Sequence, residues 1–375
     1  MASSLRIARI RGIDINIHFT WLIIFGLLAW SVAESLFPGY FPQWSGTQRW
    51  QAGIIASLLL FISVIVHELC HSLVAQSRGM EVSNITLFAF GGVSMMKGEA
   101  RRPSDEFLMA VAGPAASVGL AILFGVAWKV LEPLNEFAAA IAAYLAVLNV
   151  ALVAFNMIPG FPLDGGRVLR AALWGASGDL RGATRAASVI GQIVAFTMIF
   201  AGLMAIISGQ GLLNGMWIIL IGWFLNNAAE NSYRQLVLQE RLRGYHARDI
   251  MVQDFEVVQP DLTLRRFVEE YVLRHNQRAF PVLDDGHLLG LMTLTDLKHV
   301  PQEKWDQLTV KHMMTGLTKL QTLRSDDELQ RVLESLGDGD INQMPVVDNG
   351  RLVGMVTRSN LINFLRVREE LRLRP

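Results

Sequence analysis

Apolar runs long enough to cross a lipid bilayer are the feature of this sequence that most limits its possible folds. Six such runs occur before residue 230, at 17–37, 52–76, 107–131, 137–158, 188–208 and 212–229. About 20 apolar residues in a helix span the hydrocarbon core, and a helix satisfies its backbone polar groups internally. The sequence therefore predicts a polytopic α-helical membrane domain.

Lysine and arginine residues gather on one side of the predicted spans. An even number of spans places both termini on that side, which receives Arg6, Arg9, Arg11, Arg78, Lys97, Arg101, Arg102, Arg167, Arg170, Arg181 and Arg185. The opposite loops hold Arg49 and Lys129. Since cytoplasmic loops carry the excess of Lys and Arg, we expect an integral, multi-pass protein of a prokaryotic cell membrane with both termini in the cytoplasm. The formal net charge of zero gives no overall attraction to nucleic acid, and we expect no nucleic-acid partner.

A segment rich in β-branched and aromatic residues, VSNITLFAFGGVSMM at 82–96, separates the second and third spans. Such residues favour strands, and Gly91-Gly92 favours a turn or a close backbone approach. Two placements are open. One is a re-entrant β-hairpin packed against the helices, and the other is an ordinary hairpin in the cytoplasm.

The pattern changes after about residue 244, where short strands alternate with amphipathic helices. FPVLDDGHLLGLMTLTDL at 280–297 aligns with MPVVDNGRLVGMVTRSNL at 344–361. Each copy has a strand with Pro-Val, a glycine-containing turn of the kind hairpins need, a second strand ending in Thr, and a helix start. The C-terminal region is therefore a tandem α/β module.

Two histidines and a glutamate lie near the inner end of the second span, in the motif HELCH at 67–71. His67 and His71 are four residues apart, so a helix directs both imidazoles to one side, where they can bind one zinc ion. In H-E-x-x-H metalloproteases the glutamate, here Glu68, is the general base rather than a ligand. Ionisable residues inside a span cost about 2.5–3.5 kcal/mol each and are functional by default. Histidines buried by chance are the alternative, which three such groups at this spacing disfavour.

A catalytic zinc needs a third protein ligand and an open position for water. The candidate is Asp164 in NMIPGFPLDGGRVLR at 156–170, at the cytoplasmic end of the fourth span. Gly165 and Gly166 follow it and let the backbone approach closely. Alone, Pro-Leu-Asp-Gly-Gly would be a cytoplasmic turn, but together with HELCH it predicts the third ligand.

The membrane half resembles the site-2 protease family of intramembrane zinc metalloproteases. The resemblance is carried by HELCH on one span and by Asn-x-x-Pro-x-x-Pro-Leu-Asp-Gly near the end of a later one. It implies that His67, His71 and Asp164 bind one Zn²⁺ and that Glu68 is the catalytic base. It also suggests that Asn156 holds substrate or stabilises the oxyanion, with a helix cap or an interhelical hydrogen bond as the alternative.

The activity implied is hydrolysis of peptide bonds in or near transmembrane segments of membrane-bound protein substrates, close to the cytoplasmic face. Because a helical peptide hides its carbonyl groups, the substrate must be extended, and a strand of the 82–96 segment could hold it by strand addition. Cleavage that survived disruption of Phe88–Phe90 would count against this hypothesis.

The tandem module resembles a pair of CBS domains over about 246–368. Its strand–Thr-x-x-Asp motif runs from Thr293 to Asp296 in the first copy and from Thr357 to Asn360 in the second. In family members that bind adenine nucleotides such as ATP or AMP, these side chains hold the ribose hydroxyls. The resemblance thus implies nucleotide regulation of the protease. The alternative is that these residues cap the following helices, which leaves the pair a structural role or a role in forming a homodimer.

The expected fold class is a polytopic α-helical membrane protein, with about six transmembrane helices and a re-entrant β-hairpin, followed by a cytosolic α/β tandem CBS pair. We expect a transmembrane metalloprotease domain at 1–230, a linker at 231–245, and CBS domains at 246–305 and 306–375.

A CBS-containing transporter or channel is one alternative function, and a catalytically silent membrane scaffold is another. Transport predicts charges spread over several spans or interrupted helices, whereas here the charges gather at one site. The complete set of HELCH and Asp164 disfavours a silent scaffold.

Overall fold

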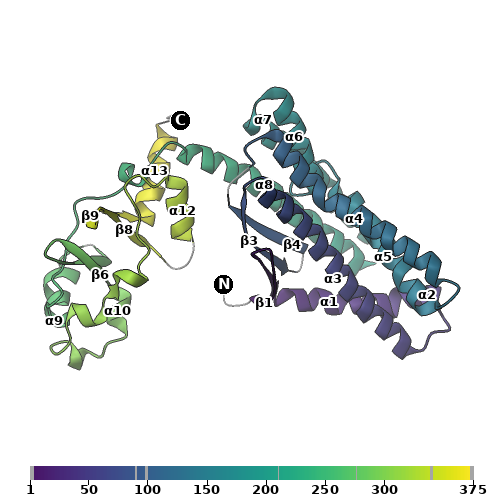
Figure 1. Ribbon diagram of the computed structural model, residues 1–375, viewed down its shortest axis with the longest axis horizontal. Helices are drawn as coiled ribbons and strands as arrows, with labels where there is room; N and C mark the ends of the chain where they lie inside the picture. The colour runs from purple at the N-terminus through teal and green to yellow at the C-terminus, as the bar shows by residue number, and fades with distance from the viewer. Residues whose placement is uncertain are drawn as a thin grey trace. The chain divides into compact units, whose positions relative to one another are not determined.

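The computed structural model describes residues 4–88, 91–97, 100–209, 211–275, 277–337 and 341–371. The chain forms two compact units, Met1–Leu236 and Val237–Pro375. The apolar spans belong to the first unit, and the tandem repeat belongs to the second (Figure 1).

Six helices in the described part of the chain are long and apolar enough to cross a membrane, which confirms the predicted number. The first span, Thr20–Tyr40, consists of α1 (Thr20–Ser31), a π-helical turn (Val32–Leu36) and α2 (Phe37–Tyr40). The others are α3 (Gly46–Ser77), α4 (Pro103–Leu131), α5 (Glu136–Asn156), α7 (Leu180–Ile207) and α8 (Leu212–Leu242). A shorter helix, α6 (Asp164–Ser177), lies between α5 and α7. The helix α8 continues well beyond the predicted span 212–229.

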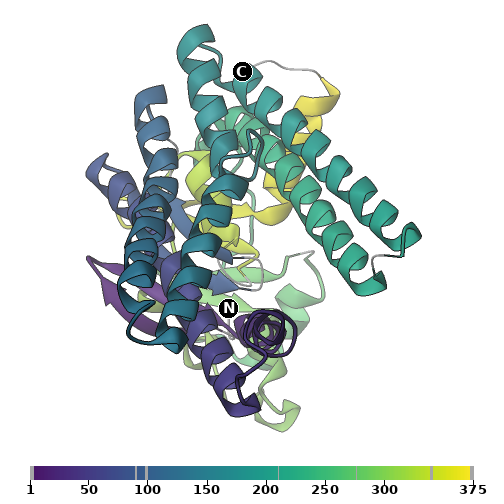
Figure 2. The same ribbon diagram turned by 90° about the vertical axis from the view of Figure 1, so that its right-hand side faces the viewer.

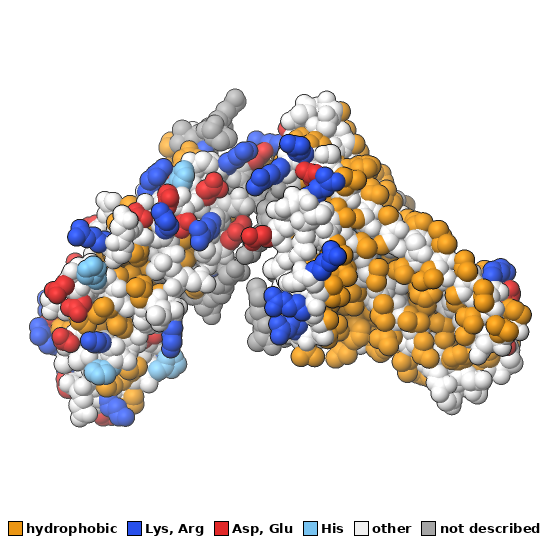
Figure 3. All heavy atoms as spheres, viewed as in Figure 1, with side chains coloured by type: hydrophobic (Ala, Val, Ile, Leu, Met, Phe, Trp, Pro, Cys, Tyr) orange, Lys and Arg blue, Asp and Glu red, His pale blue; other side chains and the backbone are white. Residues whose placement is uncertain are grey.

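Many of the buried residues on the membrane helices of the first unit are small, and many large apolar residues on the same helices are exposed. Buried alanines include Ala52 and Ala56 on α3 and Ala187 and Ala195 on α7, whereas Phe200 is 61% exposed. Close helix packing through small residues with large apolar residues outside is typical of membrane helices. Figure 3 shows hydrophobic side chains over most of the visible face of this unit. The helices α7 and α8 form an antiparallel pair (Figure 2).

A four-stranded sheet in the order β1-β2-β3-β4 accompanies these helices. The strands are β1 (Ser4–Ile10), β2 (Ile13–His18), β3 (Glu81–Phe88) and β4 (Gly91–Lys97). The pair β2–β3 is parallel, and the other two pairs are antiparallel. The predicted hairpin at 82–96 is therefore present as β3 and β4. Residues 89 and 90 lie outside the described residues, and the depth of the hairpin in the bilayer stays a prediction.

The strands β1 and β2 were not predicted, because the long apolar run that begins near residue 17 is a stronger signal than the short strands before it. The alternation of Ile13, Ile15 and Ile17 with polar residues is the signal of a half-buried strand. One face of the sheet packs on α3, where Ile13 and Ile85 lie in one buried cluster with Ala75. The sheet is thereby held beside the helix that carries the histidines.

The second unit contains two hairpins related by the predicted repeat. They are β5–β6 (Ala279–Asp284, His287–Thr293) and β8–β9 (Gln343–Asp348, Arg351–Thr357), with strands 64 residues apart in sequence. Asp285-Gly286 and Asn349-Gly350 have positive φ, as a two-residue hairpin turn requires. The two predicted turns are confirmed.

Short helices and turns complete the second unit. They are a 3₁₀ turn (Ala247–Asp249), α9 (Leu264–Phe267), a π-helical turn (Val268–Val272), α10 (Leu294–Lys298), a 3₁₀ turn (Gln302–Lys304), α11 (Val310–Met313), the short strand β7 (Thr315–Gly316), a 3₁₀ turn (Leu317–Lys319), α12 (Leu329–Gly337) and α13 (Arg358–Glu370).

A segment that precedes the first hairpin completes the core of the second repeat. Ala247 and Ile250, which precede the first hairpin, lie in the core built around the second hairpin, with Leu323 and Val346. Val252 exchanges both backbone hydrogen bonds with Met355 of β9. The core of the second repeat therefore depends on residues distant in sequence.

Candidate metal centre

The two histidines of HELCH lie side by side on α3. His67 and His71 are both buried, and their Nε2 atoms are 3.2 Å apart. Spacing by four residues places them one helical turn apart on one face, as the sequence predicts. The surrounding helices, not solvent, cover their rings.

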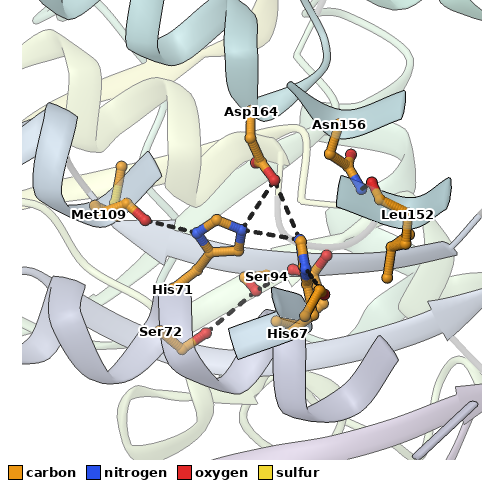
Figure 4. Close-up of polar contacts among 10 residues, drawn as sticks. His67, His71, Ser72, Ser94, Met109, Leu152, Asn156 and Asp164 are labelled. Carbon is orange, nitrogen blue, oxygen red and sulfur yellow. Dashed lines mark hydrogen bonds and ion pairs between the residues drawn. The ribbon is translucent and has the colours of Figure 1, made fainter. Parts of the chain in front are cut away.

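Asp164 lies beside the two histidines as the sequence predicts, but the helix that carries it is not the expected one. The carboxylate was expected at the end of the fourth span, but α5 ends at Asn156 and Asp164 is the first residue of a separate helix, α6. Its Oδ2 lies 3.1 Å from His67 Nε2 and 3.2 Å from His71 Nε2 (Figure 4). Among the described residues, His67, His71 and Asp164 form the group of His, Cys, Asp or Glu side chains that could hold a metal ion, with their possible ligand atoms within 4.8 Å of one another.

The donor set fits a zinc ion. Two ligand atoms at about 2.0–2.1 Å from a tetrahedral zinc are separated by roughly 3.3 Å, and the three observed separations are 3.1–3.2 Å. Two imidazole lone pairs and a carboxylate oxygen at such distances repel one another unless a proton or a metal ion lies between them. The three groups are also a ligand combination that zinc accepts.

Hydrogen bonds at the far side of each imidazole orient the rings. His71 Nδ1 donates to the carbonyl oxygen of Met109 at 2.6 Å, which leaves Nε2 with a free lone pair. His67 Nδ1 lies 2.9 Å from Ser117 Oγ. Partners of this kind fix the tautomer and the direction of a metal-binding histidine. Both partners lie on α4.

The protonation state of Asp164 also suits a metal. Burial raises the pKa of the Asp164 carboxyl, but without metal the neighbouring His67 and His71, with a proton on Nε2, donate hydrogen bonds that outweigh burial and hold that pKa below its ordinary range. The group is therefore ionised at neutral pH, which is the form that binds a cation.

Glu68 lies next to the three groups and is held by strand β4. Its Oε2 accepts a hydrogen bond from Ser94 Oγ at 3.1 Å, and Ser94 Oγ accepts one from Ser72 at 3.2 Å. Gly92 lies so close that a Cβ there would be 2.5 Å from Glu68 Cγ. The strand thus contacts Glu68 through a backbone that only glycine permits.

Asn156 is not part of this group of contacts. Its Nδ2 donates to the carbonyl oxygen of Leu152, one turn earlier on the same helix, at 3.0 Å (Figure 4). The observed bond is thus within one helix rather than between helices. Its predicted part in substrate binding stays a prediction.

The structure adds site residues that the sequence interpretation had missed. Ser117, Met109 and Ser94 were not among the candidate site residues. No motif in the sequence links these residues to the histidines. Met109 contributes only its backbone carbonyl, and the hydroxyls of Ser117 and Ser94 reach the site through tertiary packing. The spacing of Gly113 and Ser117, one helical turn apart, is a weak signal that both face the same neighbour.

The four candidate residues of the second unit form two helix caps. Thr293 Oγ1 donates to Asp296 Oδ2 at 2.7 Å, and the backbone amide of Asp296 donates back to Thr293 Oγ1 at 3.3 Å. Thr357 and Asn360 repeat this arrangement. The capping role weighed as an alternative is therefore present in both copies.

Comparison with known proteins agrees with the two-part architecture. The model of peptidase family M50 matches residues 55–133 and 132–201, and the model of the CBS domain matches 247–303 and 310–367. The chain is 35% identical over 369 residues to sll0528 of Synechocystis sp., covering 98% of this chain and 96% of the relative. It is 33% identical over 371 residues to Rip3 of Mycobacterium tuberculosis, covering 98% and 94%. Both relatives carry the name "Putative zinc metalloprotease". A solved site-2 protease from Methanocaldococcus jannaschii is 28% identical, covering 62% of this chain and 95% of that one, with a TM-score of 0.44.

These relatives and the membrane helices define the class of the protein, which is a multi-pass membrane zinc metalloprotease with a tandem CBS pair. The chain belongs to peptidase family M50, the site-2 protease family. The relatives favour this class over the transporter, channel and silent-scaffold alternatives.

Proposed function

We propose that this protein is an intramembrane endopeptidase that cuts transmembrane segments of membrane-bound proteins near the cytoplasmic face. In this proposal His67, His71 and Asp164 hold one Zn²⁺, and Glu68 is the catalytic base. The observation that carries it is the convergence of two imidazole nitrogens and one carboxylate oxygen within 3.1–3.2 Å, with Glu68 on the same helix as the histidines.

His67, His71 and Asp164 would hold the zinc ion, which would supply Lewis acidity to the scissile carbonyl and lower the pKa of a water molecule. Glu68 would take the proton from that water and deliver it to the leaving amine nitrogen. The hydrogen bond from Ser94 holds the Glu68 carboxylate by one oxygen, Oε2. Burial of both histidines excludes bulk water from the ligand side of the site.

The substrate would lie extended beside β4. This strand is an edge of the sheet, since β3 is its one neighbour among the described strands, and it also contacts Glu68. An unpaired strand edge can take an extended peptide by backbone hydrogen bonding. In this arrangement Asn156 would hold the substrate or its oxyanion, as the family resemblance suggests.

Metal removal tests this function. We expect the full chain in detergent to cleave a single-span protein substrate when it holds about one zinc per chain. A chelator should abolish cleavage, and added zinc should restore it, because the three ligands supply the reactive centre. Cleavage rate and zinc content are measured on the same samples. Full cleavage by metal-free protein would contradict the proposal.

We further propose that the CBS pair binds an adenine nucleotide, such as ATP or AMP, at Asp296 and thereby regulates the protease. The cap occupies Oδ2 of Asp296, and Oδ1 has no hydrogen bond among the described residues. A free carboxylate oxygen can accept a hydrogen bond from a ribose hydroxyl. In the second copy, Asn360 uses its amide oxygen for the cap and has an NH₂ group in the corresponding place. The first copy is therefore the better candidate.

Replacing Asp296 by asparagine separates nucleotide binding from helix capping. Asn360 shows that asparagine makes the same cap, so we expect the unfolding temperature of the Asp296→Asn variant to be unchanged. Loss of the charged acceptor should weaken AMP binding by roughly tenfold or more. Calorimetric titration of the full chain with AMP and with ATP measures this effect, and Asn360→Asp is the matched control. A wild-type chain that binds neither nucleotide would leave the pair its structural or dimerising role.

A further inference from the structure

A buried ion pair joins α4 to α6 close to the metal centre. Arg170 Nε donates to Glu106 Oε1 at 2.5 Å, and its Nη2 contacts the same oxygen. The side chains of Glu106 and Arg170 are 1% and 13% exposed. Neither residue is one of the groups that would bind zinc or take part in proton transfer. Burying such a pair is unfavourable unless its geometry is well satisfied, so its position calls for an explanation.

The pair links the two helices on which the metal geometry depends. Glu106 lies three residues before Met109, whose carbonyl oxygen orients His71. Arg170 lies six residues after Asp164, about 9 Å along the same helix. The ion pair therefore ties the helix that orients the histidines to the helix that carries the third ligand.

Arg170 also contacts the loop that leads into α6. Its guanidinium carbon lies 5.1 Å from the centre of the Phe161 ring, and Phe161 is buried. Phe161 is in turn anchored by a backbone hydrogen bond to Ala187 of α7 at 3.1 Å. One side chain thus contacts both the segment before Asp164 and the neighbouring helix α4.

We propose that Glu106 and Arg170 are positioning residues that hold Asp164 Oδ2 at binding distance from the two histidines. This inference rests on the proposed metal site and extends it to residues that do not bind the metal. Metal–ligand distances tolerate changes of about 0.2 Å. A small rotation of α6 about its loop would therefore remove the third ligand while leaving the helices folded.

The test compares metal binding by the full chain in detergent. The variants are Arg170→Gln, Glu106→Gln, Arg170→Lys and the double variant Glu106→Gln/Arg170→Gln. Zinc affinity is measured by chelator competition. The visible absorption spectrum of the cobalt-substituted protein reports the number and geometry of ligands, and thermal unfolding of the metal-free protein reports folding alone.

We expect both single glutamine variants to bind zinc at least tenfold more weakly, with weaker cobalt absorption that indicates loss of the third ligand. Arg170→Lys, which keeps the charge but not the planar fork, should be intermediate. The matched control is Arg78→Gln, since Arg78 forms a more exposed pair with Asp105, next to Glu106 on α4, at 3.3 Å. This control should keep the wild-type affinity and spectrum.

Wild-type zinc affinity and cobalt spectrum in both single variants would overturn the proposal, whatever their unfolding temperatures. If a single variant does not fold because one charge is left buried alone, the double variant decides, since it buries no charge there. A wild-type spectrum in the double variant would then overturn the proposal. A wild-type chain that binds no zinc would overturn the metal site itself, and the positioning role with it.

Discussion

Replacement of Glu68 by glutamine is expected to abolish peptide-bond cleavage while the zinc content stays at the wild-type level. Glutamine has nearly the shape of glutamate and can still accept the hydrogen bond from Ser94, so the local structure should persist. It cannot take a proton from water, and loss of a general base costs about 10²–10⁴-fold in rate. The three proposed ligands are unaffected, because Glu68 is not one of them.

The measurement is the initial rate of cleavage of a single-span substrate, with zinc determined on the same samples. Glu132→Gln is the matched control. It also converts a carboxylate to an amide, but at the opposite end of α4 from Glu106, where Glu132 pairs with Lys129. The control should cleave at the wild-type rate. A Glu68→Gln variant that cleaves normally would refute the assignment of the base, and one that loses its zinc would make Glu68 part of the metal site.

The second large effect is expected from Gly113→Ala, which should remove zinc binding without unfolding the protein. A Cβ at Gly113 would lie 2.1 Å from His71 Nε2 and 2.6 Å from His67 Nε2. The atoms in conflict are the tips of two side chains, so the rings can turn away at little cost to the fold. Alanine is also the better helix former, by about 1 kcal/mol. The same rotation takes both metal-binding nitrogens out of position.

We expect zinc affinity to fall by at least about a hundredfold, since misplacement of reacting groups by about 1 Å has effects of that size. Chelator competition measures the affinity, and thermal unfolding of the metal-free protein tests the fold. Gly119→Ala provides the control, because it lies on the same helix and the Cβ that it would gain meets no atom within 4 Å beyond its chain neighbours and the adjacent backbone of α4. Normal zinc affinity in Gly113→Ala would show that the histidines bind metal in another orientation, or not at all.

Local spacing accounts for the part of the site that could be predicted. His67 and His71 face the same way because four residues make about one helical turn, and this holds in any α-helix. Glu68 followed from its place in the motif. Asp164 could be proposed by chemistry, since a third ligand was needed and this carboxylate follows the fourth span on the side where HELCH lies. Its place at the start of a separate helix could not be inferred from the apolar pattern.

The contacts that complete the site depend on packing between distant segments. Ser117 and Met109 reach the histidines from α4, Ser94 reaches Glu68 from β4, and Arg170 reaches Glu106 from α6. None of these pairs is close in sequence, and no periodicity brings them together. They exist because the helices cross at one place and because Gly92 and Gly113 allow close approach there.

The same division holds for the fold as a whole. The six spans and the two C-terminal hairpins were determined by the sequence itself, because hydrocarbon demands long apolar helices and because each Gly-containing turn sets its own hairpin. Tertiary structure decided that strands β1 and β2 extend the β3–β4 hairpin into a sheet, and that residues 247–252 complete the core of the other repeat. The physical reason is that local propensity acts over a few residues, whereas the burial of surfaces depends on segments that meet only in the folded chain.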